Sequence, residues 1–291
     1  MFRDACRKAR GFTRPIFSVW CHIDGRLVHS AASLVVVNAH GWFVTAAHVF
    51  HPLTKAMADE SAIREYTQQK SAIEAHPSLD RKHKNKQIAK LPFDKDWITA
   101  AQYFWMNGPI APLAMKVLHA SRSHDLAAGQ IADFDPSSIS EYPVFKRSDD
   151  NVEPGASLCR MGFPFAKTDL TLDVNGSANF NVAEVTYFPN EAMFTRHVGL
   201  DTADASGEPV PRFIETSTPG LRGQSGGPVF DQLGVVWGIQ SHTTHVPLGF
   251  DPPDPNKPSQ TIHQFLNVGN AVHPAIIRWF LTKHGVEFES T

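Results

Sequence analysis

Cysteines and long apolar runs are both scarce in this sequence. Only three cysteines occur, Cys6, Cys21 and Cys159, which is too few for a disulfide framework. Residues 1–20 carry positive charges but lack the run of about seven apolar residues that forms a signal-peptide core. No segment approaches the roughly 18 uninterrupted apolar residues of a membrane-spanning helix. These absences predict a cytoplasmic protein with no membrane partner.

Net charge is scarce as well. The 27 Lys and Arg side chains nearly balance the 29 Asp and Glu side chains, and the formal charge is −2. Because nucleic-acid-binding domains carry a basic excess, no nucleic-acid partner is expected. The chain is 42% apolar and 19% charged, which is typical of a folded globular protein.

Short β-branched and aromatic runs separated by Gly, Pro, Asn and Asp fill both halves of the chain. They lie at residues 16–23, 33–37, 42–46, 157–161, 182–187 and 235–240. This rhythm predicts antiparallel β structure in a barrel or a sandwich. Residues 201–211 and 250–260 are dense in Pro, Asp and Gly, and they predict long, mobile loops without regular strand pairing.

Two segments predict helices. Residues 56–90 are rich in helix formers and include the basic run 81–86, so we expect a helical insert with a solvated charged face. Residues 273–284 predict an amphipathic C-terminal helix. Its apolar stripe consists of Ala275, Ile276, Trp279 and Phe280.

Residues 223–228, with the sequence GQSGGP, have the form of a nucleophile turn. A nucleophilic serine projects from a tight turn whose N–H groups point at the developing oxyanion, and flanking glycines permit that conformation. Ser225 is therefore the candidate nucleophile. A plain Gly-rich turn between strands is the alternative interpretation.

One histidine and three aspartates are candidate partners for this serine. His48 ends a predicted strand beside small residues that leave room for an imidazole, although an ordinary histidine is the alternative. Asp125 follows an apolar run, as the buried aspartate of a triad does. Asp133 and Asp135 lie nearby, and the local sequence does not choose among the three.

Taken together, the motifs resemble those of the chymotrypsin family. His48, Asp125 and Ser225 occur in that order, within VTAAHV, HDLA and GQSGGPVF, and residues 155–165 and 234–243 match as well. The chain is most similar to bacterial trypsin-like peptidases related to the high-temperature-requirement proteases. The resemblance spans roughly residues 15–286.

The resemblance implies an all-β fold of two six-stranded antiparallel β-barrels with a helical insert and a C-terminal helix. We expect one peptidase domain over residues 1–286. The expected parts are the first barrel at 15–135 with an insert at 52–104, the second barrel at 150–272 and the C-terminal helix at 273–286.

The resemblance also implies the catalytic roles. His48, Asp125 and Ser225 would form a catalytic triad in the cleft between the barrels. The N–H groups of Gly223 and Ser225 would form the oxyanion hole. This favours a serine endopeptidase acting on protein or peptide substrates through an acyl-enzyme. A catalytically silent peptide-binding module and an ester hydrolase are the alternatives.

Five residues are expected to contact the substrate: Pro219, Gly220, Ser241, His242 and Thr243. The last three would pair with its backbone as an added strand. Pro219 would form the base of the primary pocket, where no acid receives Lys or Arg, so we expect a small or apolar side chain before the scissile bond. Asp251 or Asp254 would overturn this if either reached the pocket wall.

Gln224 departs from the digestive members of the family, in which an Asp pairs with an N-terminus released by cleavage. Because Gln forms no ion pair, activation by N-terminal processing is not expected. Permanent order of the oxyanion loop and ordering by a substrate or a regulatory protein partner both stay open. No cofactor and no metal are expected, since the pairs His48/His51 and His242/His245 lack further ligands.

Overall fold

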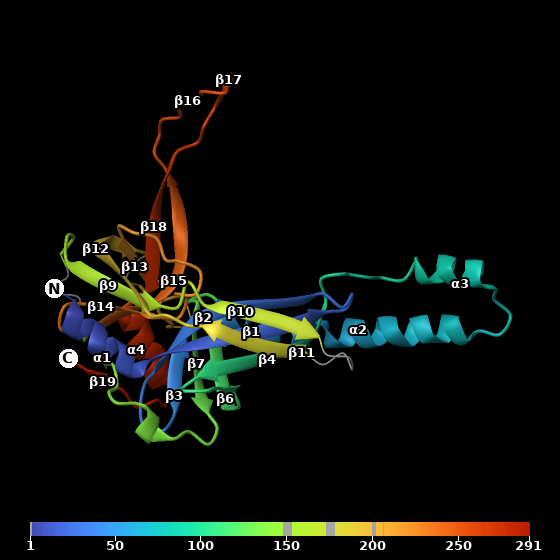
Figure 1. Ribbon diagram of the computed structural model, residues 1–291, viewed down its shortest axis with the longest axis horizontal. Coiled ribbons are helices and arrows are strands. Elements are labelled where there is room, and N and C mark those ends of the chain that lie inside the picture. The colour runs from blue at the N-terminus through green and yellow to red at the C-terminus, as the bar shows by residue number, and fades with distance from the viewer. Residues whose placement is uncertain (1, 148–152, 173–177, 200–201, 206) are drawn as a thin grey trace.

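Two β-barrels form the body of the molecule, and two arms project from it (Figure 1). The computed structural model describes residues 2–147, 153–172, 178–199, 202–205 and 207–291. The predicted start of the second barrel at residue 150 and residues 201 and 206 of the predicted loop lie outside these ranges. Within them, no helix is long and apolar enough to cross a membrane.

The first barrel is a sheet with the strand order β5-β4-β1-β2-β3-β7-β6. Its strands are β1 (Thr13–His22), β2 (Leu27–Val36), β3 (Trp42–Thr45), β4 (Ile98–Met106), β5 (Ile110–Pro112), β6 (Met115–Ser121) and β7 (Leu126–Ile131). Only Leu113 and Ala114 separate the edge strands β5 and β6, of which one pairs with β4 and the other with β7. Together they act as one bent strand that curls the sheet round on itself. Buried Ile16, Leu34 and Phe43 help to fill its interior.

The second barrel closes through backbone hydrogen bonds. Its order is β14-β9-β12-β13-β18-β15, and β14 pairs with β15 to complete the ring. The strands are β9 (Ser157–Gly162), β12 (Phe188–Val198), β13 (Phe213–Thr216), β14 (Pro228–Phe230), β15 (Val236–Pro247) and β18 (Phe265–Val272). Short strands β8 (Val144–Phe145) and β19 (Glu289–Ser290) extend this sheet beyond β15. The predicted all-β, two-barrel architecture is confirmed.

A separate hairpin lies against the first barrel. It pairs β10 (Lys167–Leu172) with β11 (Ala178–Glu184), and Phe180 of β11 packs on Phe17 and Phe104, with ring centroids 5.5 Å apart in both contacts. A short helical turn, η2 (Pro136–Ser138), begins the connection between the barrels.

A helical arm leaves the first barrel after the turn η1 (Ala47–Phe50). It consists of α2 (His51–Ala75) and α3 (Arg81–Ile88), and α3 begins where the Asp80 carboxylate accepts a hydrogen bond from the N–H of His83 at 2.8 Å. The helical insert is therefore present. Its predicted end at residue 104 is wrong, because residues 98–104 belong to β4, which pairs with β1.

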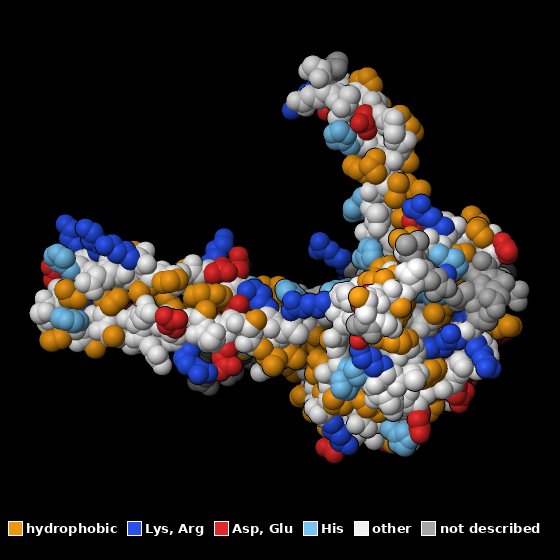
Figure 2. Space-filling view, turned by 180° about the vertical axis from the view of Figure 1, so that it is seen from behind, with side chains coloured by type: hydrophobic (Ala, Val, Ile, Leu, Met, Phe, Trp, Pro, Cys, Tyr) orange, Lys and Arg blue, Asp and Glu red, His pale blue; other side chains and the backbone are white. Residues whose placement is uncertain are grey.

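A β arm continues the second barrel. Strands β15 and β18 run outward as far as the Pro247–Phe265 pair, and β16 (Pro253–Asp254) pairs with β17 (Lys257–Thr261) near the tip. The prediction that residues 250–260 lack regular pairing is wrong, because in a two-stranded arm a proline can face outward without costing a ladder hydrogen bond. Figure 2 shows apolar side chains along this arm, including exposed Leu248, Phe250, Ile262, Phe265 and Leu266.

Two helices cover the second barrel on the side where the chain ends meet (Figure 1). The C-terminal helix α4 (Pro274–Lys283) is close to its predicted span. The N-terminal helix α1 (Arg3–Phe12) was not predicted, and β1 starts at Thr13 rather than at 15. The buried face of α1 consists of Ala5, Ala9, Gly11 and Phe12 at helical spacing among charged residues, so the sequence carries an amphipathic signal that the prediction did not use.

Candidate active site

The two barrels hold the predicted catalytic residues on separate elements. His48 lies in η1, directly after β3, and its ring is about half exposed, at 48%. Buried Ala46 and Ala47 precede it, and the hydroxyl of buried Tyr103 donates to the carbonyl of Val49 at 3.1 Å. The backbone that carries His48 is therefore anchored to β4.

Asp125 lies in the turn between β6 and β7. Its φ of 49° is in the left-handed region, which turns the carboxylate toward η1. The Nδ1–H of His48 donates to Oδ2 at 2.9 Å, and the backbone N–H of His48 donates to Oδ1 at the same distance. A further hydrogen bond, of 2.5 Å, comes from the hydroxyl of Ser241 in β15. Asp125 thus joins the two barrels.

The pKa of Asp125 lies below its usual value. Burial acts to raise this pKa, but the hydrogen bonds from His48 and Ser241 and the nearby imidazole outweigh burial. The other two candidate aspartates do not contact His48 within the described residues. Asp135 accepts hydrogen bonds from the N–H and hydroxyl of Ser137, both at 2.9 Å, and Asp133 is exposed.

Ser225 faces the cleft from the second barrel. Its hydroxyl lies 3.5 Å from the carbonyl oxygen of Ser241, and its own carbonyl accepts the N–H of Ser33 in β2 at 2.8 Å. Among the described residues there is no hydrogen bond between Ser225 and His48. The structure therefore brings His48 and Asp125 into contact and leaves the serine hydroxyl without a strong acceptor.

The turn before Ser225 has the geometry of an open anion site. The N–H of Gln224 donates to the carbonyl of Leu221 at 2.9 Å, and Gly223, the third residue of this turn, has a φ of +95°. That positive φ defines a type II turn, and a Cβ at Gly223 would lie 2.4 Å from the carbonyl oxygen of Phe163. In the described part of the chain, no acceptor takes up the N–H of Gly223 or of Ser225.

Gln224 is fully buried and replaces an ion pair with neutral hydrogen bonds. Its side-chain oxygen accepts the N–H of Leu221 at 2.9 Å, and its amide nitrogen donates to the carbonyl of Phe188 at 3.2 Å. Both partners belong to the second barrel or its loops. The order of this loop thus depends on contacts within the second barrel and on Ser33 of β2, whose hydroxyl donates to the carbonyl of Gly223 at 2.8 Å.

The predicted substrate residues lie on two neighbouring segments, the loop at Pro219 and Gly220 and the strand β15 at residues 241–243. The hydroxyl of Thr243 donates to the carbonyl of Gly220 at 2.9 Å, which joins the loop to β15. Strand β14 pairs with one edge of β15 between Val236 and Ile239 and goes no further along it. At residues 241–243 no described strand covers that edge. Asp251 and Asp254 are not on the pocket wall, because both bond within the β arm, Asp251 to His263 and Asp254 to Asn256.

Arg160, which contacts the loop at Pro219, was not predicted from the sequence. It lies in β9 between buried Cys159 and Met161, and it is 1% exposed. Its guanidinium donates to the carbonyl of Pro219 at 2.9 Å. The signal that could have found it is a charged residue within an otherwise apolar strand.

His242 extends the polar network behind Asp125. The Ser241 hydroxyl donates to Asp125, so its oxygen accepts from Nδ1 of His242, 2.9 Å away. Burial lowers the pKa of His242, and the negative charge of Asp125 only partly opposes this. No group of three or more side chains suited to a metal ion occurs among the residues that the structure describes.

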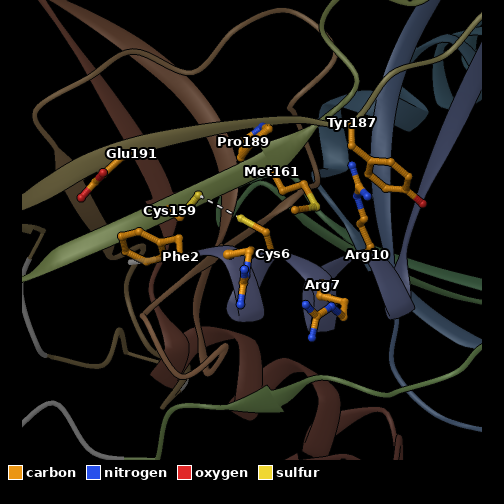
Figure 3. A pocket seen from close by; sticks show the side chains of 10 residues that line it. Phe2, Cys6, Arg7, Arg10, Cys159, Met161, Tyr187, Pro189 and Glu191 are labelled. Atoms are coloured by element: carbon orange, nitrogen blue, oxygen red, sulfur yellow. Dashed lines mark hydrogen bonds between the residues drawn. The ribbon is translucent and has the colours of Figure 1, made fainter.

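A separate cavity of about 620 Å³ lies between α1, β9 and β12 (Figure 3). No triad candidate lines it. Cys6 and Cys159 meet there with their sulfur atoms 4.0 Å apart, and burial raises the pKa of both thiols. Protonated thiols are weak nucleophiles, so these cysteines do not compete with Ser225 for that role.

Comparisons with known proteins agree with the fold. Two solved structures of a serine-to-alanine variant of the HtrA-type protease AlgW superpose with TM-scores of 0.51. The complex with a tripeptide is 14% identical, and the match covers 98% of this chain and 65% of that one. For the complex with a decapeptide the values are 12%, 98% and 68%. The chain therefore spans about two thirds of that protease, and the likeness shows the chymotrypsin-like fold.

No curated relative matches the chain, but a family model does. Residues 32–239, which include His48, Asp125 and Ser225, match the trypsin-like peptidase domain. That range spans most of both barrels, and the chain belongs to the trypsin-like peptidase family.

Proposed function

We propose that the chain is a serine endopeptidase that hydrolyses peptide bonds through a triad of His48, Asp125 and Ser225. The observation that carries the proposal is the 2.9 Å hydrogen bond between Nδ1 of His48 and Asp125. It holds the ring in the tautomer whose Nε2 is free to accept a proton. A general base beside a serine nucleophile needs that arrangement.

The proposed reaction has two halves. The hydroxyl oxygen of Ser225 bonds to the substrate carbonyl carbon while its proton moves to Nε2 of His48. The N–H groups of Gly223 and Ser225 stabilise the oxyanion, and one such donor typically contributes about 3 kcal/mol. The C–N bond then breaks as the amine takes the proton from His48. Water attacks the acyl group by the same route and restores the hydroxyl.

We infer that the substrate is an extended segment of a protein or peptide. The uncovered edge of β15 at residues 241–243 supports this, because an extended chain can add to such an edge through main-chain hydrogen bonds. The peptides in the two AlgW structures point to the same class of ligand. The three free thiols suit a reducing compartment, and we propose the cytoplasm as the location.

We also propose that the oxyanion loop needs no N-terminal processing. Gln224 bonds to Leu221 and Phe188, and Arg160 bonds to Pro219. The hydroxyl of Ser33 in β2 adds a bond to the carbonyl of Gly223, so both barrels hold the loop without the N-terminus. A regulatory protein partner stays a prediction for steps other than the ordering of this loop.

Active-site labelling separates the proposal from a catalytically silent peptide-binding module. A fluorophosphonate reacts only with an activated serine, so we expect covalent labelling of the wild type at Ser225 and none of Ser225→Ala. The wild type is also expected to cleave an unfolded protein such as casein, whereas Ser225→Ala does not. Absence of both labelling and cleavage in the wild type would exclude the enzyme and favour the binding module.

A further inference from the structure

Arg160 is a buried cation without an anion. Its guanidinium donates to the carbonyls of Pro219 and Thr218 at 2.9 and 3.3 Å, and to the hydroxyl of Thr216 at 2.5 Å. Its Nε is buried and has no acceptor. Burial lowers the pKa of Arg160 to about 10, so the side chain stays protonated at neutral pH.

The neighbouring carboxylates are occupied elsewhere. Glu215 accepts two hydrogen bonds from Arg196, at 2.9 and 3.0 Å, and Glu191 accepts one from Ser157 at 2.9 Å. No ion pair within the described residues includes Arg160. A buried charge with only dipolar partners is unfavourable, and an incoming anion would improve its environment.

The guanidinium lies directly behind the loop that the family resemblance places at the base of the primary pocket. It holds the carbonyl of Pro219, the predicted base of that pocket. On the opposite wall, Thr243 holds Gly220 and pairs with Gly269 of β18. A Cβ at Gly269 would lie only 2.2 Å from an Nη of Arg160, so the guanidinium fills the space that a side chain of β18 would take.

We propose that Arg160 determines specificity and that the enzyme cleaves after acidic side chains, glutamate or aspartate. The inference rests on the proposed function and names its substrate class. A carboxylate that enters this pocket meets a fixed positive charge in a poorly hydrated wall, where the attraction is strong. A lysine or arginine meets the same charge and is repelled. This replaces the expectation of a small or apolar side chain before the scissile bond.

A set of internally quenched peptides tests the proposal with the full chain. The peptides differ only in the residue before the scissile bond, which is Glu, Gln, Asp, Asn, Ala or Lys. We expect kcat/KM for Glu to exceed that for its uncharged isostere Gln by about tenfold or more, with the same order for Asp over Asn. Cleavage after Lys should be about a hundredfold slower than after Glu. Equal rates for Glu and Gln, or a preference for Lys or Ala, would overturn the proposal.

Variants connect this preference to Arg160. In Arg160→Met the ratio of Glu to Gln should fall to about one, whereas Arg160→Lys keeps the charge and should keep a ratio above about three. Arg64→Met removes an exposed arginine from the distant helical arm and should leave the ratio unchanged. If Arg160→Met does not fold, the ratios of Glu to Gln measured for the wild type and for Arg160→Lys still test the proposal.

Failure of the inference is distinguishable from failure of the proposed function. If the wild type takes up fluorophosphonate at Ser225 and cleaves peptides without preferring acids, the proposed function stands and the proposed specificity is wrong. If the wild type is not labelled and cleaves no peptide in the set, both the proposed function and the proposed specificity are wrong.

Discussion

The two walls of the cleft hold their polar groups in different ways. On the first barrel, Asp125 and His48 form a direct carboxylate–imidazole pair. On the second barrel, Gln224 holds the oxyanion loop through neutral hydrogen bonds, and Arg160 carries a charge with no counter-ion. In the proposed mechanism the paired charge lies where a proton moves and the neutral bonds hold the loop that binds the oxyanion. The unpaired charge of Arg160 would be completed by an acidic side chain of the substrate.

The largest effect is expected when the negative charge of Asp125 is removed from the first barrel. Asp125→Asn would favour the wrong imidazole tautomer, and we expect kcat to fall by about 10⁴-fold while the fold persists. Asp135→Asn is the matched control, because Asp135 bonds only within its own turn. A severe loss in Asp133→Asn or Asp135→Asn, with normal turnover in Asp125→Asn, would refute this assignment.

A smaller effect is expected when the neutral hydrogen bonds of Gln224 are removed from the second barrel. Gln224→Ala removes two hydrogen bonds from the oxyanion loop, and we expect kcat to fall by about ten- to a hundredfold, less than for loss of the carboxylate. Steady-state kinetics should show most of the change in kcat rather than in KM. An unchanged kcat would mean that other contacts suffice to hold the loop.

The hydrogen bond from Ser241 to Asp125, which joins the two barrels, should contribute to the free energy of unfolding in a pH-dependent way. Because its folded-state pKa is lowered, Asp125 stabilises the fold above its unfolded-state pKa of about 3.9, and this stability is lost as the pH falls through the folded-state value. Ser241→Ala removes one donor, so urea unfolding should give a loss of about 1–2 kcal/mol at pH 7. The loss should shrink below about pH 4. A difference that is constant with pH would argue against a charge-dependent bond.

The smallest effect is expected at the N-terminus. A short tag placed before Met1 should leave the rate of fluorophosphonate labelling unchanged, because Gln224 takes its partners from its own barrel. Cleavage of the tag should also have no effect. A large gain in labelling after trimming would instead indicate activation by processing.

The sequence predicted the features that depend on local pattern. The GQSGGP turn, the strand that ends at His48, the helical insert and the C-terminal helix all have short-range signals. The choice of Asp125 over Asp133 and Asp135 came from the family resemblance. Of the three, Asp125 is the one that bonds to His48 among the residues that the structure describes, and its catalytic role stays a prediction.

What the sequence could not predict depends on contacts between distant segments. Helix α1 has an apolar stripe at helical spacing, but the surface that this stripe covers is formed by distant residues such as Cys159 and Phe230. The β arm overrides the usual effect of its prolines because both its strands are edges. The proposed role of Arg160 depends on its contacts with Pro219 and Gly269, which are distant in the sequence and could not be predicted from it.

The contact between Arg160 and Gly269 also has an evolutionary consequence. A side chain at position 269 would collide with the guanidinium, so position 269 is restricted to glycine while Arg160 is present, whereas Arg160 can be replaced beside Gly269 without a clash. Among homologous sequences an arginine at 160 should therefore occur with glycine at 269, and larger residues at 269 should occur only with a small residue at 160. Loss of the proposed preference would need one substitution in β9, whereas its gain in a relative with a larger residue at 269 would need a second substitution in β18.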